Sequence, residues 1–240
     1  MSSGDDTAIV RFATWNMHGG VGNDRRYDPA RIIAVLREVC CDVVALQEVA
    51  SLALHGEFLR QLRDALGLQV VTARTLTRRS NDYGNALLSR FPISRNTSIE
   101  LTVGHHEPRN AIDAWLDVRG QEVRVVATHL GLRPAERREQ VARILDAIAA
   151  ERCAVTVLMG DLNEWYLWGR PLRWIRAQFR PAPSPPTFPA RRPVLALDRI
   201  WVHPPGRLRG VATHRSILAR AASDHLPLVA QVSLAGPTSG

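Results

Sequence analysis

Lysine is absent from this chain, so all 31 basic residues are arginine. They outnumber the 23 acidic residues and give a formal net charge of +8. Because the guanidinium group binds phosphate oxygens in pairs, an excess of arginine favours nucleic acid, phospholipid headgroups or nucleotides as partners. A genome-wide composition bias is the alternative explanation for the missing lysine. The charge indicates an anionic partner without identifying it.

Cysteines and long apolar runs are also scarce. The three cysteines, Cys40, Cys41 and Cys153, have the spacing of neither a disulfide framework nor a zinc site, so we expect core or near-core thiols. No apolar run is long enough to span a bilayer. The first residues lack the basic cluster and apolar stretch of a secretory signal. These absences predict a cytoplasmic protein.

The chain is long enough for one large core, and no composition break or repeat divides its 240 residues. We therefore expect a single domain over residues 7–234, with a disordered N-terminus at 1–6 and a disordered tail at 235–240.

Strand and helix patterns alternate along that domain. Helical periodicity predicts helices that begin at Asp28-Pro29, cover 57–66 and 134–150, and include 168–179. Short β-branched and apolar runs predict strands at 8–15, 42–46, 68–72, 84–89, 93–101, 111–118, 123–128, 154–160, 197–202, 208–213 and 226–234. Successive strands without intervening helices indicate an antiparallel or mixed sheet.

Polar side chains gather where these strands begin or end. The clearest case is the apolar run from Val155 that stops at Gly160-Asp161-Leu-Asn163-Glu164. Any one of these residues has an ordinary structural explanation, such as a turn. Together they predict a site of hard oxygen ligands suited to Mg²⁺ and less suited to zinc. The set comprises Asn16, Glu48, His129, Asp161, Asn163, Asp198, Asp224 and His225.

The segment from Trp165 to Leu197 contains no acidic residue and mixes arginine with aromatic residues. Such a mixture binds membrane surfaces or stacks on bases. However, Trp168, Leu172, Ile175 and Phe179 recur at helical spacing, which more often marks an amphipathic helix packed on the core. We favour core packing, with the arginines on a solvated, phosphate-attracting face.

Seven motifs in order resemble the endonuclease/exonuclease/phosphatase superfamily, whose fold is that of DNase I. The resemblance implies an α/β protein, a four-layer α/β sandwich of two mixed β-sheets flanked by helices. The motifs are Thr14-Trp-Asn16-Met-His-Gly, Leu46-Gln-Glu48-Val, Gly84-Asn85-Ala-Leu-Leu-Ser-Arg-Phe-Pro-Ile93, Thr128-His129-Leu, Gly160-Asp161-Leu-Asn163, Leu197-Asp198-Arg-Ile and Ser223-Asp224-His225-Leu-Pro-Leu.

The resemblance also implies a metal site. Glu48 would be the principal ligand of Mg²⁺, with Mn²⁺ as an alternative, and Asn16 would lie beside it. Asp224 would support the metal or His225. Asn85 and Arg109 are weaker candidates for phosphate contacts, and a surface ion pair is the alternative for Arg109.

The same resemblance implies roles in hydrolysis. Asp161 and Asn163 would hold the attacking water and the phosphate, or a second metal. His225 would pair with Asp198, which fixes its tautomer, and His129 would donate to a phosphoryl oxygen. The base is either Asp161 or His225, and the sequence does not choose between them.

The substrate is less closely defined. The chain lacks the lysine that DNA-repair members often carry after the metal-binding glutamate, because Val49-Ala50 follow Glu48. Its motifs resemble sphingomyelinase-like and small bacterial phosphodiesterase members more. We therefore expect a phosphate ester that is lipid-like or small, with DNA endonuclease or exonuclease activity as the alternative. An anionic membrane surface or nucleic acid is a candidate partner, and no obligate protein partner is inferred. A catalytically silent binding module is the hypothesis from another class.

Overall fold

The structure is a computed structural model that describes residues 9–50, 57–73 and 83–234. The predicted disordered ends, 1–6 and 235–240, lie outside the described residues. No helix in the described part of the chain is long and apolar enough to cross a membrane.

Six strands form the first mixed sheet, in the order β10-β11-β1-β2-β4-β3. Within it β1 and β2 are parallel, whereas the remaining neighbours are antiparallel. The strands are β1 (Ile9–Asn16), β2 (Val43–Ala50), β3 (Gln69–Ala73), β4 (Tyr83–Ser89), β10 (Leu208–Thr213) and β11 (Leu228–Ser233).

Five strands form the second mixed sheet, in the order β5-β6-β7-β8-β9. Here β7 and β8 are the parallel pair. The strands are β5 (Ile93–Glu100), β6 (Asn110–Val118), β7 (Gln121–His129), β8 (Thr156–Asp161) and β9 (Asp198–His203).

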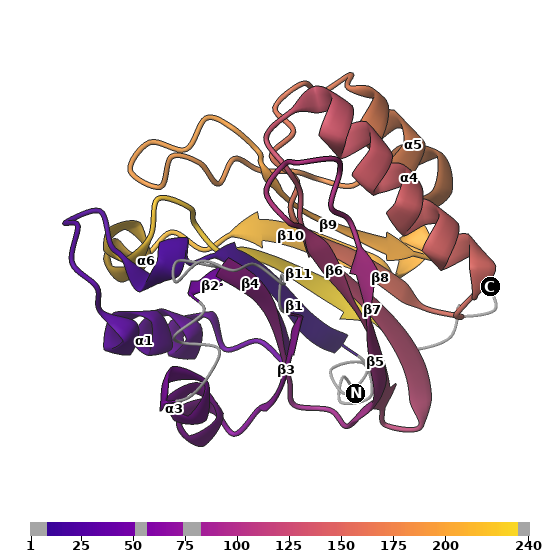
Figure 1. Cartoon of the computed structure of the whole chain (residues 1–240). Coiled ribbons are helices and arrows are strands. Elements are labelled where there is room, and N and C mark those ends of the chain that lie inside the picture. Colours follow the sequence, from indigo (N-terminus) through magenta and orange to yellow (C-terminus); the bar gives the residue numbers. More distant parts are fainter. Residues whose placement is uncertain (1–8, 51–56, 74–82, 235–240) are drawn as a thin grey trace.

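The helices cover the outer faces of the two sheets (Figure 1). The helices beside the first sheet are α1 (Pro29–Val39), α3 (Glu57–Leu66) and α6 (Ile217–Ala222), and those beside the second are α4 (Pro134–Ala150) and α5 (Arg170–Phe179). An apolar core with side chains from both sheets fills the space between them. The predicted four-layer sandwich is confirmed.

The burial of strand β8 on both faces explains why its sequence does not alternate between apolar and polar residues. Val157 and Met159 face the core between the sheets, while Leu158 packs under α4 and α5. Both faces of the strand are therefore covered, and its first polar side chain after the apolar run is Asp161 at the carboxyl end.

Local signals in the sequence set several helix boundaries. Asp28 caps α1 by accepting a hydrogen bond from the Arg31 backbone N–H, and Pro29 occupies the first turn. The predicted ranges 57–66 and 134–150 are confirmed as α3 and α4. The short helix α6 was not predicted, because its six residues are too few to show a helical period.

Two predictions about burial are wrong. Cys40 is exposed because it is the left-handed C-cap of α1, whereas Cys41 is buried and Cys153 is half-buried. Trp168 does not lie on the core face of a helix, since it precedes α5 and its side chain is 74% exposed. Leu172, Ile175 and Phe179 do face the core, as predicted.

The two parallel strand pairs bring four carboxyl ends to one rim of the sandwich. In the register of the sheets, Asn16 pairs with Gln47 and His129 pairs with Asp161. Because β9 runs antiparallel to β8, its first residue, Asp198, lies opposite Asp161 at the same rim. Crevices at the carboxyl ends of strands are where α/β proteins usually bind ligands.

A close approach of β7 and β8 sets the position of Asp161, and Gly160 permits it. A Cβ at Gly160 would lie 1.9 Å from the carbonyl oxygen of Thr128, and its φ of +151° is one that side chains rarely adopt. We expect Gly160→Ala to lower the free energy of unfolding by roughly 2–5 kcal/mol, through steric overlap and backbone strain. Denaturant unfolding measures this change.

Gly206→Ala is the matched control, because a Cβ there meets nothing within 4 Å. We expect its effect to stay within about 0.5 kcal/mol of wild type. Equal stability of the two variants would contradict the close strand approach.

Candidate active site

One amide group connects the two sheets at this rim. Asn16, at the end of β1, donates from Nδ2 to Glu48 Oε1 at 2.8 Å and to Asp161 Oδ2 at 3.1 Å. Its own oxygen accepts a hydrogen bond from the His18 backbone N–H at 3.0 Å. The side chain is therefore fixed in orientation, and its amide group connects Glu48 of the first sheet to Asp161 of the second.

A β-bulge directs Glu48 into the rim. The register of β2 against β4 shifts between Leu46 and Val49, so β2 contains one extra residue there. Glu48 adopts a φ of +54°, in the left-handed region. Its side chain is 25% exposed, more than those of Asp161 and His129 beside it. Glu48 is thus the carboxylate of this group that a ligand can most easily reach.

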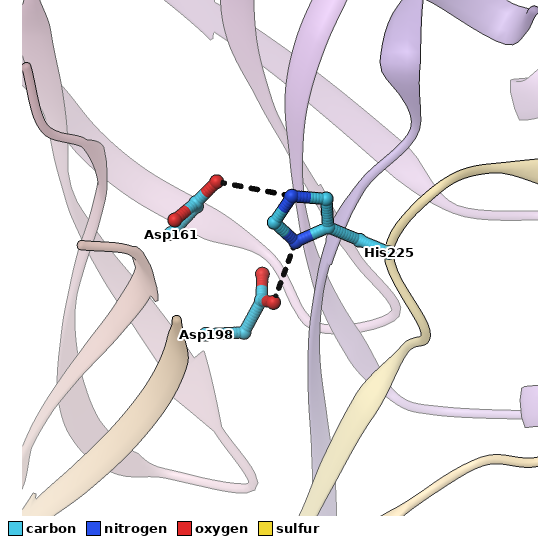
Figure 2. A group of neighbouring side chains, drawn as sticks. All are labelled: Asp161, Asp198 and His225. Atoms are coloured by element: carbon cyan, nitrogen blue, oxygen red, sulfur yellow. Dashed lines mark hydrogen bonds and ion pairs between the residues drawn. The ribbon is translucent and has the colours of Figure 1, made fainter. Parts of the chain in front are cut away.

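A buried histidine–aspartate pair lies next to Asp161 (Figure 2). His225 Nδ1 is 2.8 Å from Asp198 Oδ2, which also accepts a hydrogen bond of 2.5 Å from Thr187 Oγ1. Burial alone would lower the pKa of His225, but the Asp198 and Asp161 carboxylates outweigh it and raise this pKa to about 10. The two carboxylates therefore favour the cationic form of His225.

Asp161 lies between the two imidazoles of the site. Its Oδ2 is 3.7 Å from His225 Nε2 and 3.6 Å from His129 Nε2, and its Oδ1 accepts from the Asn163 backbone N–H at 2.9 Å. Burial raises the pKa of Asp161 to about 6 although the His225 charge opposes the shift. Asp161 is thus the buried acid on which the other polar groups converge.

His129 is held neutral by its surroundings. Burial, followed by the Arg109 charge, keeps the pKa of His129 well below its usual value. Arg109 Nη1 can only donate to Nδ1, at 2.9 Å, so the ring proton lies on Nε2, which faces Asp161. Asn163 donates from Nδ2 to the Leu130 carbonyl oxygen at 2.9 Å, and its 3.1 Å contact with Nε2 joins two donors in this tautomer and is not a hydrogen bond. His129 is therefore a neutral donor directed at the rim.

The remaining candidates lie at the edge of this group. Asn85 and Arg109 line a small depression together with Glu48 and His129. Asn85 Nδ2 donates to the Asn110 carbonyl oxygen at 3.0 Å, and Arg109 also pairs with Glu107 at 2.8 Å. Asp224 is more peripheral, because its carboxylate accepts a 3.4 Å hydrogen bond from Ser223, and among the described side chains no hydrogen bond or ion pair joins it to Glu48.

The donor set fits a divalent metal. Glu48 and Asp161 offer carboxylate oxygens on either side of the Asn16 amide, and two such charges close together in a buried rim are stabilised by a cation. Asp198 Oδ1 is buried without a hydrogen-bond partner. Atoms of Asp161, Asp198 and His225 also lie within 4.8 Å of one another, so this group could bind a metal.

Sequence reasoning missed several residues that hold the catalytic candidates in place. Thr187, in a proline-rich loop, hydrogen-bonds Asp198, and no local pattern marks it. Trp15 donates from Nε1 to the His225 carbonyl oxygen at 3.0 Å, and Ser223 Oγ donates to the Asn16 carbonyl oxygen at 2.7 Å. Both belong to motifs noted in the sequence, but their spatial partners are distant in the chain.

Comparisons with known proteins agree with this architecture. The model of the endonuclease/exonuclease/phosphatase family matches residues 13–225. The uncharacterized protein YbhP of Escherichia coli K12 is 30% identical over 250 residues, which cover 93% of this chain and 96% of YbhP. The crystal structure of an endonuclease/exonuclease/phosphatase from Beutenbergia cavernae superposes with a TM-score of 0.77 at 25% identity, covering 97% of this chain and 73% of that one.

A human structure shares the fold. The catalytic domain of human Nocturnin, solved with a bound sulfate anion, superposes with a TM-score of 0.72 at 19% identity, covering 94% of this chain and 93% of that one.

Proposed function

Since this chain belongs to the endonuclease/exonuclease/phosphatase family, whose members are phosphoester hydrolases, we propose that it is a Mg²⁺-dependent phosphoesterase of the cytoplasm. The favoured substrate is a lipid-like or small phosphorylated molecule. One observation carries the proposal: a single amide, Asn16, connects Glu48 to Asp161 beside the His225–Asp198 pair. Metal ligands and proton-transfer groups therefore meet at one rim.

Glu48 would hold the metal, with an oxygen of Asp161 next to it. Asn16 would join them through its amide oxygen, once the amide turns from its hydrogen bond with the His18 N–H. A divalent ion held there would supply positive charge to neutralise the charge that develops on the phosphoryl oxygens. Glu48 suits this role because it is the carboxylate of the group with solvent access. Mn²⁺ offers similar ligand preferences and is the alternative ion.

The chain's own side chains supply the rest of the chemistry. Water attacks phosphorus in line with the ester oxygen, which departs with the bonding electron pair and takes up a proton. Asp161 and Asn163 orient the water and the phosphoryl group. His225 carries its transferable proton at Nε2, since Asp198 binds Nδ1. Asp161 is one candidate for the group that accepts the proton of water. His225 is the other in its neutral form, because the cationic ring donates from both nitrogens.

His129 and Arg109 would bind the phosphoryl group. The neutral His129 ring points its Nε2–H at the rim, and Arg109 holds the ring in that tautomer. Human Nocturnin, which shares the fold, was solved with a sulfate anion, a close mimic of phosphate. This supports anion binding by proteins of this fold.

Chelation tests the metal requirement. We expect EDTA to lower the rate of hydrolysis of bis(p-nitrophenyl) phosphate by about a thousand-fold or more, because it removes the charge that stabilises the transition state. Added Mg²⁺ or Mn²⁺ restores the rate, and Zn²⁺ restores it less. The measurement is the release of p-nitrophenol after removal of EDTA by gel filtration.

A substrate panel tests the substrate class, with short-chain phospholipids, small phosphate esters and supercoiled plasmid offered in parallel. Faster turnover of the first two supports the proposal. Plasmid nicking that is abolished both by EDTA and by His225→Ala would establish the nuclease alternative instead. Inactivity of the wild type across the whole panel, with either metal, would favour the silent binding module.

A further inference from the structure

Four consecutive large apolar side chains lie exposed in the loop that follows strand β8. They form what we call the aromatic loop, residues 165–168. The exposed fractions are 42% for Trp165, 46% for Tyr166, 53% for Leu167 and 74% for Trp168. Large apolar groups that gather on a surface usually mark an interaction site.

The aromatic loop is fixed from beneath by a buried ion pair. Arg137, in α4, pairs with Glu164 at 3.2 Å, and both side chains are almost fully buried. Glu164 also accepts from the Tyr166 backbone N–H at 3.1 Å, and Arg137 lies 5.3 Å from the centre of the Trp165 ring. The polar part of the loop is thus tied down while its apolar side chains face outward.

The exposed apolar surface extends to the loop before α4. Leu132 is 61% exposed, and its carbonyl oxygen accepts a 2.6 Å hydrogen bond from the same Arg137 side chain. The helices that follow the two loops, α4 and α5, lie side by side (Figure 1). Leu132 follows His129 by three residues, and the aromatic loop follows Asn163 by two. Both parts of this surface therefore follow residues of the active-site rim within a few positions in the sequence.

Among the described residues, four arginines near these residues in the sequence have side chains without a polar partner. Within the described ranges, no hydrogen bond or ion pair engages the side chains of Arg133, Arg138, Arg170 or Arg173. Arg138 and Arg170 line a depression of about 470 Å³ together with Tyr166, Trp168 and Glu164, whose carboxylate is paired with Arg137. No acidic residue occurs from 165 to 197. The surface is thus complementary to an anion that also carries apolar groups.

We infer that this surface docks on an anionic phospholipid bilayer, with the aromatic loop at the boundary between headgroups and acyl chains and the arginines on lipid phosphates. Tryptophan and tyrosine favour that boundary. The exposed Leu132 and Leu167 favour lipid over single-stranded nucleic acid, because leucine does not stack on bases. The inference rests on the proposed function and extends it, since docking would present the rim to a lipid substrate.

Vesicle sedimentation tests the docking without requiring turnover. In EDTA, we expect the chain to bind vesicles of phosphatidylglycerol and phosphatidylcholine, and to bind pure phosphatidylcholine much more weakly. Trp165→Ala/Trp168→Ala should weaken binding by about thirty-fold or more, because two rings no longer enter the interface. Arg170→Gln/Arg173→Gln should weaken it by about ten-fold or more.

Ile217→Ala is the matched control, because Ile217 is 90% exposed on α6, which flanks the other sheet. We expect it to bind as wild type does. Brominated acyl chains should quench part of the tryptophan fluorescence, and the double tryptophan variant should lose that quenching while the buried Trp15 and Trp201 still emit. Circular dichroism confirms that each variant is folded.

Other outcomes overturn the inference. Binding that is equal for wild type and the double tryptophan variant, or absent for both, excludes docking by the aromatic loop. Tighter binding to a single-stranded oligonucleotide than to anionic vesicles, lost in the same variant, assigns the surface to nucleic acid. Glu48→Gln should still bind vesicles, so loss of catalysis and loss of docking are separable. Failure of the proposed function would show as docking without turnover.

Discussion

Glu48→Gln lowers kcat/KM for a phosphodiester by about a thousand-fold or more, because it removes the most accessible carboxylate that would hold the metal. Glutamine has nearly the same shape and can still contact Asn16, so the fold should be retained. The loss is therefore electrostatic. Steady-state kinetics at saturating Mg²⁺, together with Mg²⁺ binding by calorimetry, measures it.

Glu57→Gln provides the matched control for this substitution. Its carboxylate is exposed on α3, where it pairs with Arg60 at 3.8 Å. We expect wild-type rates and Mg²⁺ affinity from this variant. Near-wild-type activity of Glu48→Gln would remove Glu48 from the metal site.

His225→Ala lowers kcat by about a thousand-fold, because Nε2 no longer transfers a proton. Asp198→Asn should have an effect of similar size, since the asparagine no longer stabilises the cationic ring. If the two side chains act as a unit, the double variant loses little more than either single variant. Initial rates of all three variants, compared in a double-mutant cycle, measure the coupling.

His225→Ala should also lower the free energy of unfolding. Removal of His225 leaves the fully buried Asp198 carboxylate without its partner, which costs about 3–5 kcal/mol of unfolding free energy. His214→Ala is the matched control, because His214 pairs with Glu38 at 3.0 Å on the surface. We expect that change to cost less than about 1 kcal/mol. Equal stability losses in the two variants would contradict a buried ion pair at His225.

Much of the architecture was predictable because strand ends leave a local signal. The run from Val155 to Asp161 predicts a strand covered on both faces, and β8 is such a strand. The motifs around Asn16 and His225 meet at one rim, because β1 ends at Asn16 and pairs antiparallel with β11, which begins just after His225. For these residues, the neighbouring positions in the sequence are enough to predict the local structure.

Other features depend on contacts that the sequence does not display. The Asn16 side chain joins Glu48 and Asp161 across two sheets, which periodicity cannot reveal. The bulge at Glu48 arises from the pairing register of β2 and β4. Trp168 matches a helical period by chance, and only the position of the α5 N-terminus shows that it is exposed. Local sequence patterns therefore failed to predict the contacts between residues that are distant in the chain.

The isotopic composition of the product tests the central claim most directly. Wild type and Glu48→Gln are incubated with bis(p-nitrophenyl) phosphate and Mg²⁺ in ¹⁸O-labelled water. Mass spectrometry then measures the ¹⁸O content of the p-nitrophenyl phosphate that is formed. If this rim directs water at phosphorus, the wild-type product contains one ¹⁸O, and Glu48→Gln forms almost none of it in the same time. Absence of labelled product from the wild type, or equal formation by the two proteins, would contradict the account.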